Sequence, residues 1–146
     1  MSDRIRPIVI GVIIHDGKLF VFEGTDPLKG ETFYRPLGGS IEFGERAEAA
    51  LIRELQEELN ADLVNLSYLT TTENIFTYQG KPHHEIVMIY TAEFADKSFY
   101  EDRDFLGHED DGSEMICSWQ PLAKFSSGEL ILYPDGLNEV IKSHLI

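Results

Sequence analysis

The segment GGSIEFGERAEAALIRELQEELNA, residues 38–61, places a pair of glycines before an acidic helix. Within it Glu54, Glu57 and Glu58 are spaced i, i+3 and i+4, so their side chains share one face of an α-helix. The neighbouring arc of the helix is apolar and is predicted to face the core; it carries Leu51, Ile52, Leu55 and Leu59. The segment therefore predicts a helix with one buried side and one acidic edge.

The acidic edge predicts a bound cation. Carboxylates spaced i, i+4 repel each other, and partial burial strengthens the repulsion. A hard divalent cation such as Mg²⁺ would relieve it, because Mg²⁺ prefers oxygen ligands and commonly keeps waters and substrate phosphates as further ligands. Arg53 flanks Glu54 and Glu57 and could orient one of their carboxylates. For three glutamates considered alone, a solvated acidic face is the more ordinary interpretation.

The complete spacing of this segment resembles the Nudix box, the signature of the Nudix hydrolases. The pattern is G-x5-E-x7-R-E-U-x-E-E-x-G-U, where U is aliphatic, and it is filled by Gly39, Glu45, Arg53, Glu54, Leu55, Glu57 and Glu58. Two final positions depart from it, with Asn60 in place of the usual glycine and Ala61 in place of a larger aliphatic residue. Asparagine tolerates the left-handed conformation that ends many helices, and neither departure removes an acidic residue.

The resemblance implies a fold, a reaction and a cofactor. The implied fold is a Nudix-type α/β/α sandwich, with a mixed β-sheet and flanking helices. The implied reaction is hydrolysis of a phosphoanhydride bond in a nucleoside diphosphate linked to another moiety, such as a nucleoside triphosphate, ADP-ribose or another nucleotide sugar. The implied cofactor is Mg²⁺, with Mn²⁺ as a substitute, and its ligands are the carbonyl of Gly38 and the side chains of Glu54, Glu57 and Glu58.

The predicted catalytic residues are Glu54, Arg53, Glu57 and one glutamate outside the motif. Glu54, oriented by Arg53, or the outside glutamate would accept the proton of the attacking water. Glu85 is the first candidate for the outside glutamate, because it lies at the start of a predicted strand. Three further candidates are Glu73, Glu109 and Glu114. For each of them, a solvated carboxylate is the alternative interpretation.

Arg35 and Tyr34 come directly before the glycines and are predicted to bind the substrate. The guanidinium of an arginine suits a phosphate group, because it is a planar fork of hydrogen-bond donors. An ordinary exposed loop arginine is the alternative for Arg35.

Hydrophobic alternation predicts two β-hairpins and a C-terminal helix around the motif. The first hairpin joins residues 5–14 to residues 19–22 through an Asp-Gly turn, and the second joins residues 62–78 to residues 83–94. The remaining predicted elements are a loop over 24–31, an extended segment over 33–37, a strand over 115–122 and an amphipathic helix over 135–145. Strands joined as hairpins and interleaved with two helices predict a mixed sheet covered by helices.

Residues 95–114 are polar and strongly acidic and show no periodicity. A loop of this length is usually functional or disordered. One interpretation is a lid over the cleft, whose rings Phe99, Tyr100 and Phe105 stack on a base. The other is a mobile acidic surface loop.

Length and charge limit the partners of the chain. Its 146 residues predict one domain over 1–146, and its net charge of −14 disfavours a nucleic-acid polymer or an anionic membrane. A small nucleotide-type substrate is compatible with this charge, because bound Mg²⁺ would invert the local field. A lone cysteine and an apolar run too short to cross a bilayer make the cytoplasm the default location. The resemblance also allows a homodimer.

The competing hypothesis is a Nudix domain that senses a nucleotide, or serves as a scaffold, without turning it over. Its usual sequence mark is the loss of an acidic residue from the motif. Here all of the motif's acidic residues and Arg53 are present, which favours the enzyme.

Overall fold

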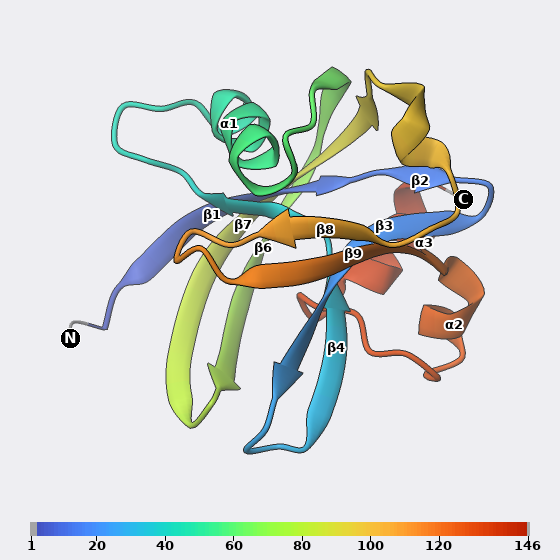
Figure 1. The fold of residues 1–146 in the computed structure, drawn as a ribbon. Helices are drawn as coiled ribbons and strands as arrows, with labels where there is room; N and C mark the ends of the chain where they lie inside the picture. The colour runs from blue at the N-terminus through green and yellow to red at the C-terminus, as the bar shows by residue number, and fades with distance from the viewer. Residues whose placement is uncertain (1–2, 146) are drawn as a thin grey trace.

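The computed structural model describes residues 3–145, so the two ends of the predicted domain, residues 1, 2 and 146, lie outside the described residues. Its strands form two sheets (Figure 1). The first has the order β5-β1-β7-β6 and is mixed, because β1 and β7 run parallel. The second has the order β2-β3-β9-β8, with β4 also paired to β3, and is antiparallel.

The elements follow one another along the chain in a fixed order. They are β1 (Ile5–Val12), β2 (Ile14–His15), β3 (Lys18–Asp26), β4 (Glu31–Arg35), β5 (Gly38–Ser40), α1 (Ala47–Leu59), β6 (Leu63–Tyr78), β7 (Lys81–Phe94), the 3₁₀ helix η1 (Lys97–Tyr100), β8 (Phe105–His108), β9 (Glu114–Pro121), α2 (Leu122–Ser126) and α3 (Leu137–Leu145).

Helices cover both faces of the strands, with α1 on one side and α2 and α3 on the other (Figure 1). Successive side chains of a strand point to opposite faces, and β1 uses both. Val9 packs in one core cluster with Leu51 and Leu55 of α1, whereas Ile10 packs in the second cluster with Ile141 of α3. This arrangement confirms the predicted α/β/α sandwich with a mixed sheet. The division into two sheets was not predicted.

Helix α1 ends where the sequence predicts. Asn60 follows it in the left-handed conformation, with φ 54° and ψ 41°, and its N–H donates to the carbonyl of Gln56. The predicted apolar stripe is correct for its leucines but wrong for Ile52, which is 39% exposed. Ala50 is fully buried instead, and it packs in the same core cluster as Leu51 and Val9 of β1.

The two predicted hairpin turns are present. Asp16 and Gly17 both have positive φ, as do Gln79 and Gly80, which is the turn geometry that matches the twist of two paired strands. In the first hairpin only β2 pairs with β3, because β1 leaves that sheet and pairs with β5 and β7.

The predicted loop over residues 24–31 is wrong, because β3 continues to Asp26 and pairs with β4 from Glu31 onwards. Gly24 has a packing role within the strand. A Cβ at this position would lie 2.5 Å from the ring of Phe33, so the glycine makes room for an aromatic side chain of the neighbouring strand.

The interpretation of residues 95–114 as one long loop with rings free to stack on a base is also wrong. The segment contains η1 and β8. The ring of Phe99 stacks on Phe94 at 4.8 Å, that of Tyr100 stacks on Trp119 at 5.6 Å, and Phe105 is buried. Phe105 belongs to the core, and the rings of Phe99 and Tyr100 pack against it.

No helix within residues 3–145 has both the length and the apolar character needed to cross a membrane.

Candidate functional site

The acidic edge of α1 meets the turn between β8 and β9. Carboxylate oxygens of Glu54, Glu57 and Asp110 lie within 4.8 Å of one another, and Glu54 is almost completely buried. Asp110 comes from the turn, whereas the two glutamates come from the helix. We call Glu54, Glu57 and Asp110 the acidic cluster.

Arg53 ties the helix to the segment before it. Its Nε and Nη2 donate to the two carboxylate oxygens of Glu45 at 2.8 and 3.0 Å, which is a bidentate contact. Its Nη1 donates to Glu57 at 3.1 Å and to Glu54 at 3.4 Å, and its Nη2 also donates to the carbonyl of Ser40 at 3.0 Å. The bidentate hydrogen bond lowers the pKa of Glu45 to about 2. Arg53 therefore fixes the position of two carboxylates on its own helix.

The two glycines of β5 let the strands approach the helix. A Cβ at Gly39 would collide with the carboxylate of Glu54, and a Cβ at Gly38 would collide with the carbonyl of Val9. Only glycine leaves room for Glu54 in its present position. This explains physically why the motif has a glycine at this distance before the glutamates.

The donor set fits a divalent cation. Within residues 3–145, the buried atoms Oε1 of Glu54 and Oε1 of Glu58 have no hydrogen-bond partner. Burial, followed by the nearby charge of Asp110, raises the pKa of Glu54 to about 7. Burial, followed by the charges of Glu54 and Asp110, raises the pKa of Glu58 to about 9. Buried, mutually repelling oxygen donors without partners are the ligands that a hard cation would satisfy.

Asp110 is the member of the acidic cluster that sequence reasoning missed. It lies in a run of acidic residues, Glu109 to Asp111, inside the segment interpreted as a loop. Gly107 brings this turn close to α1, because a Cβ there would lie only 3.0 Å from the carbonyl of Glu58. The sequence signal for Asp110 was therefore an acidic run preceded by a glycine. That signal does not identify its neighbours, because Glu54 and Glu57 lie more than 50 residues earlier in the chain.

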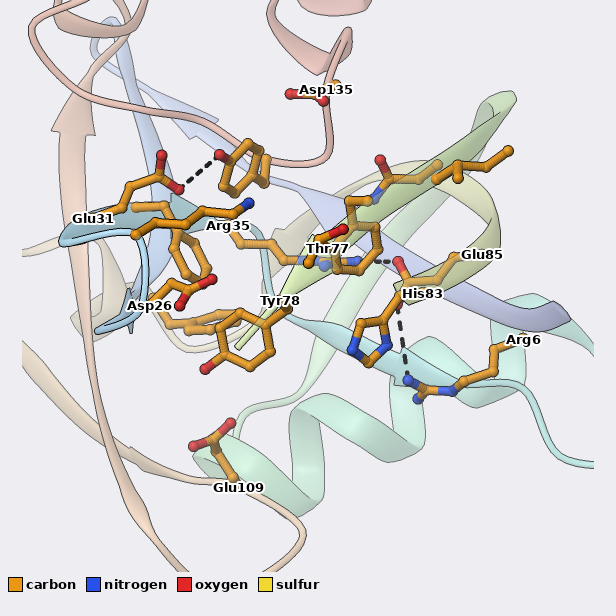
Figure 2. A pocket seen from close by; sticks show the side chains of 17 residues that line it. Arg6, Asp26, Glu31, Arg35, Thr77, Tyr78, His83, Glu85, Glu109 and Asp135 are labelled. Carbon is orange, nitrogen blue, oxygen red and sulfur yellow. Dashed lines mark hydrogen bonds and ion pairs between the residues drawn. The ribbon is translucent and has the colours of Figure 1, made fainter. Parts of the chain in front are cut away.

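A pocket of about 700 Å³ opens between the β3–β4 and β6–β7 hairpins (Figure 2). One wall comes from alternate residues of β4, and the other comes from cross-strand neighbours of β6 and β7 that share a face. Phe33 and Arg35 line one wall, and Asn74, His83 and Glu85 line the other. The pocket thus combines aromatic surface with charged and amide groups.

The carboxylate of Asp26 closes one end of this pocket. It is buried and accepts the N–H of Leu28 at 3.1 Å and the N–H of Gln79 at 3.0 Å. Leu28 belongs to the β3–β4 turn and Gln79 to the β6–β7 turn, so Asp26 joins the tips of hairpins from different sheets. At another edge the pocket is lined by Glu109, the chain neighbour of Asp110. The pocket and the acidic cluster therefore adjoin.

Some of the residues predicted to bind the substrate, or to supply a glutamate from outside the motif, line the pocket, and others do not. Arg35 and Glu85 both line it, and Arg35 donates to Glu85 at 2.9 Å. Tyr34 points to the opposite face, since neighbouring residues of a strand alternate; its hydroxyl donates to Glu23 and its ring lies against Phe125. Glu85 lies with arginines rather than in the acidic cluster.

The other candidate glutamates occupy three different places. Glu109 lines the pocket, whereas Glu73 on β6 and Glu114 on β9 have exposed side chains. Among the described residues, Asp110 is the group outside the motif that joins Glu54 and Glu57.

The fold and the acidic cluster define an α/β/α protein whose carboxylates could hold a divalent metal ion at the edge of a pocket. The chain belongs to the Nudix family, since the family model described as NUDIX domain matches residues 5–138. A relative from Proteus vulgaris, described as 8-oxo-dGTP diphosphatase, is 35% identical over 78 residues, which cover 52% of this chain and 70% of the relative. These matches confirm the predicted enzyme class, a Nudix-type pyrophosphohydrolase, and support a nucleotide as substrate.

Solved structures share the fold at low sequence identity. A MutT NUDIX hydrolase from Burkholderia pseudomallei superposes with a TM-score of 0.60 at 18% identity, covering 99% of this chain and 100% of the other. A NUDIX hydrolase from Nitrosomonas europaea gives 0.65 at 16% identity, covering 95% and 87%.

Proposed function

We propose that this chain uses Mg²⁺ to hydrolyse a phosphoanhydride bond in a nucleoside diphosphate derivative. The observation that carries the proposal is the acidic cluster, in which the buried Oε1 of Glu54 lacks a hydrogen-bond partner within the described chain. Glu57 and Asp110 contribute the other two carboxylates, and the pocket beside them is large enough for a nucleoside.

The residues that would hold Mg²⁺ are Glu54, Glu57, Glu58 and the carbonyl of Gly38, as the motif implies, together with Asp110. When bound, the ion would withdraw charge from the phosphoryl oxygens and lower the pKa of a water molecule. Mn²⁺ offers the same oxygen-ligand chemistry and is the expected substitute.

Glu54 accepts the proton of the attacking water through its carboxylate, which Arg53 holds beside the carboxylates of Glu57 and Asp110. Arg53 acts through Glu54 and Glu57 by holding both carboxylates in place. Asp110 supplies the carboxylate outside the motif in place of Glu85, because Glu85 is engaged by Arg35.

The pocket would take the nucleoside, whose base would lie against the aromatic surface of Phe33 and the paired rings of Phe76 and His83. The substrates to test first are nucleoside triphosphates, including 8-oxo-dGTP because of the relative from Proteus vulgaris, and then ADP-ribose and other nucleotide sugars.

The test is a hydrolysis screen of these compounds in Mg²⁺, with and without a chelator. We expect turnover of one compound class by the parent chain and a loss of about a hundredfold or more in the Glu57→Gln and Asp110→Asn variants. Glu114→Gln is the matched control, because it removes an exposed carboxylate from the same hairpin as Asp110 without touching the cluster. Nucleotide binding without turnover by the parent chain would instead support the sensing domain. Full activity of Asp110→Asn would exclude this aspartate from the site.

A further inference from the structure

Glu85 lies between two arginines that come from different sheets. Nη2 of Arg35 on β4 donates to its Oε1 at 2.9 Å, and Nη1 of Arg6 on β1 lies 3.9 Å from its Oε2. Figure 2 shows both contacts converging on the one carboxylate. The side chain of Glu85 is only 6% exposed, so its charge is neutralised by these partners and not by water.

This arrangement carries more positive than negative charge. Two guanidinium groups face one carboxylate, which leaves an excess of one positive charge in a chain whose net charge is −14. The other end of the pocket differs, because Asp26 and Glu31 lie there (Figure 2). Lys29 also lines the pocket and lies close to Asp26, so the other end carries both signs of charge with no excess of positive charge. An anionic group entering the pocket is therefore drawn toward Arg6 and Arg35.

Arg6 has donors to spare. Its side chain is 47% exposed, against 15% for Arg35. Its Nη2 donates to the hydroxyl of Ser40 at 2.9 Å, and the distance of 3.9 Å to Glu85 is an ion pair without a hydrogen bond. A guanidinium carries several N–H groups in a fixed fork, so the remaining donors of Arg6 are available to a ligand.

Ser40 connects Arg6 to the catalytic helix. Its hydroxyl accepts from Arg6, while its carbonyl accepts from Nη2 of Arg53 at 3.0 Å. Arg53 in turn holds Glu54 and Glu57. Ser40 of β5 thus bridges the guanidinium of Arg6, which faces the pocket, and the guanidinium of Arg53, which orients the acidic cluster.

We propose that Arg6 binds a phosphate group of the substrate, and that Glu85 is a positioning residue that holds Arg6 and Arg35 for this contact. The inference rests on the proposed function for the identity of the phosphate as part of a nucleotide. Phosphate accepts the planar fork of an arginine in bidentate fashion, which a lysine cannot reproduce. Glu85 is then needed for binding, and its carboxylate takes no proton from water.

The direct test measures the binding of inorganic pyrophosphate to the parent chain and its variants by calorimetry in the presence of a chelator. Arg6→Met should weaken pyrophosphate binding by about tenfold or more, since a charge-assisted bidentate contact is lost. Arg6→Lys should restore only part of it. Arg4→Met is the control, because Arg4 is exposed two residues earlier, does not line the pocket and should bind as the parent does.

Kinetics distinguishes a positioning role of Glu85 from a role as the catalytic base. For the compound hydrolysed best, Arg6→Met should raise KM with kcat within about threefold, because uniform binding is lost. Glu85→Gln should raise KM in the same way and leave the pH dependence of kcat unchanged. A change in the pH profile of kcat would instead make Glu85 the base and overturn its positioning role.

The two proposals fail separately. Equal pyrophosphate affinity of the parent and Arg6→Met, or no binding by the parent, would overturn the anion site even if nucleotides are hydrolysed. Loss of pyrophosphate binding in Arg6→Met, with no nucleotide hydrolysed by the parent, would remove the proposed function and leave the anion site in place.

Discussion

At Glu54, stability and chemistry make opposite demands on a single carboxylate. The residue is 2% exposed, its side-chain Oε1 has no hydrogen-bond partner in the described part of the chain, and its pKa rises to about 7. An ionised carboxylate in this position costs folding free energy, yet it is the form that binds a cation.

Replacing Glu54 with glutamine should stabilise the metal-free protein and remove its activity. The amide keeps the shape of the side chain but carries no charge, so the cost of burying an ionised group near the charge of Asp110 disappears. We expect the metal-free Tm near pH 8 to rise by about 3 °C or more, and hydrolysis to fall by about a hundredfold or more. Thermal denaturation with chelator and the hydrolysis assay measure the two effects.

The control for this substitution is Glu48→Gln, on the exposed side of the same helix. It should change stability by no more than about 0.5 kcal/mol and leave activity intact. A lower metal-free Tm in Glu54→Gln would show that the contact with Arg53 outweighs the cost of the buried charge.

Among the elements, the two long hairpins decide the shape of the pocket. Each is a pair of strands whose tip extends beyond the helix layers, and in Figure 1 both tips extend on the side opposite α1. Asp26 joins them through the N–H groups of Leu28 and Gln79. The hydroxyl of Tyr78 adds a weaker link to the carbonyl of Thr25 at 3.1 Å.

Asp26→Ala should separate the hairpin tips and weaken substrate binding. Hydrogen bonds to a charged group contribute about 1.5–3 kcal/mol each, and water at the tips would recover part of the loss. We expect a loss of stability of about 2–4 kcal/mol, a KM raised by about tenfold and a kcat within about threefold. Urea denaturation and steady-state kinetics check these values.

Tyr78→Phe is the graded control, because it removes the weaker link while keeping the ring. Its effect should stay within about 1 kcal/mol. If Asp26→Ala left KM unchanged while lowering stability, the hydrogen bonds of Asp26 would stabilise the fold without shaping the pocket.

The elements that could be predicted from sequence are those whose signals are local. The glycines before α1, its 3.6-residue periodicity and Asn60 after it identify the helix and its end. Gly24 and the aromatic residues of the 95–114 segment were misread for the opposite reason. Gly24 leaves room for the ring of Phe33 on the neighbouring strand, and Phe105 packs in a core built from residues far apart in sequence. Neither signal can be interpreted without knowing which strands pair.

The stability of the whole molecule should depend on pH because of its buried carboxylates. Glu54 and Glu58 have pKa values of about 7 and about 9 in the folded chain, above the ordinary value of 4.5. The folded state therefore holds these protons more tightly than the unfolded state. The resulting stability is present below about pH 4.5 and is lost as pH rises through 7 and then 9.

The metal-free Tm should accordingly fall between about pH 6 and about pH 9, and added Mg²⁺ should raise Tm more at the upper end of this range. The lowered pKa of Glu45, about 2, acts in acid and does not affect this window. Thermal denaturation in chelator and in Mg²⁺ across the range is the measurement. A flat or rising metal-free Tm, or an equal effect of Mg²⁺ at both ends, would contradict the prediction.

At the scale of the molecule, the family and the layered fold could be predicted because the motif is compact in sequence. The pocket and Asp110 could not, because they depend on contacts between segments that the sequence keeps apart. Arg35 and Glu85 were both selected as candidates, but their pairing across the pocket became visible only with the two hairpins placed face to face.

The turn between β8 and β9 has a consequence for how this enzyme can evolve. Glu109 lines the pocket and its neighbour Asp110 belongs to the acidic cluster, so the proposed tasks of recognition and chemistry fall on consecutive positions. Inserting or deleting one residue there would exchange the two side chains and disturb both tasks at once. Descendants that change substrate by mutation should therefore alter the identity of residue 109 freely, yet preserve the length of the turn.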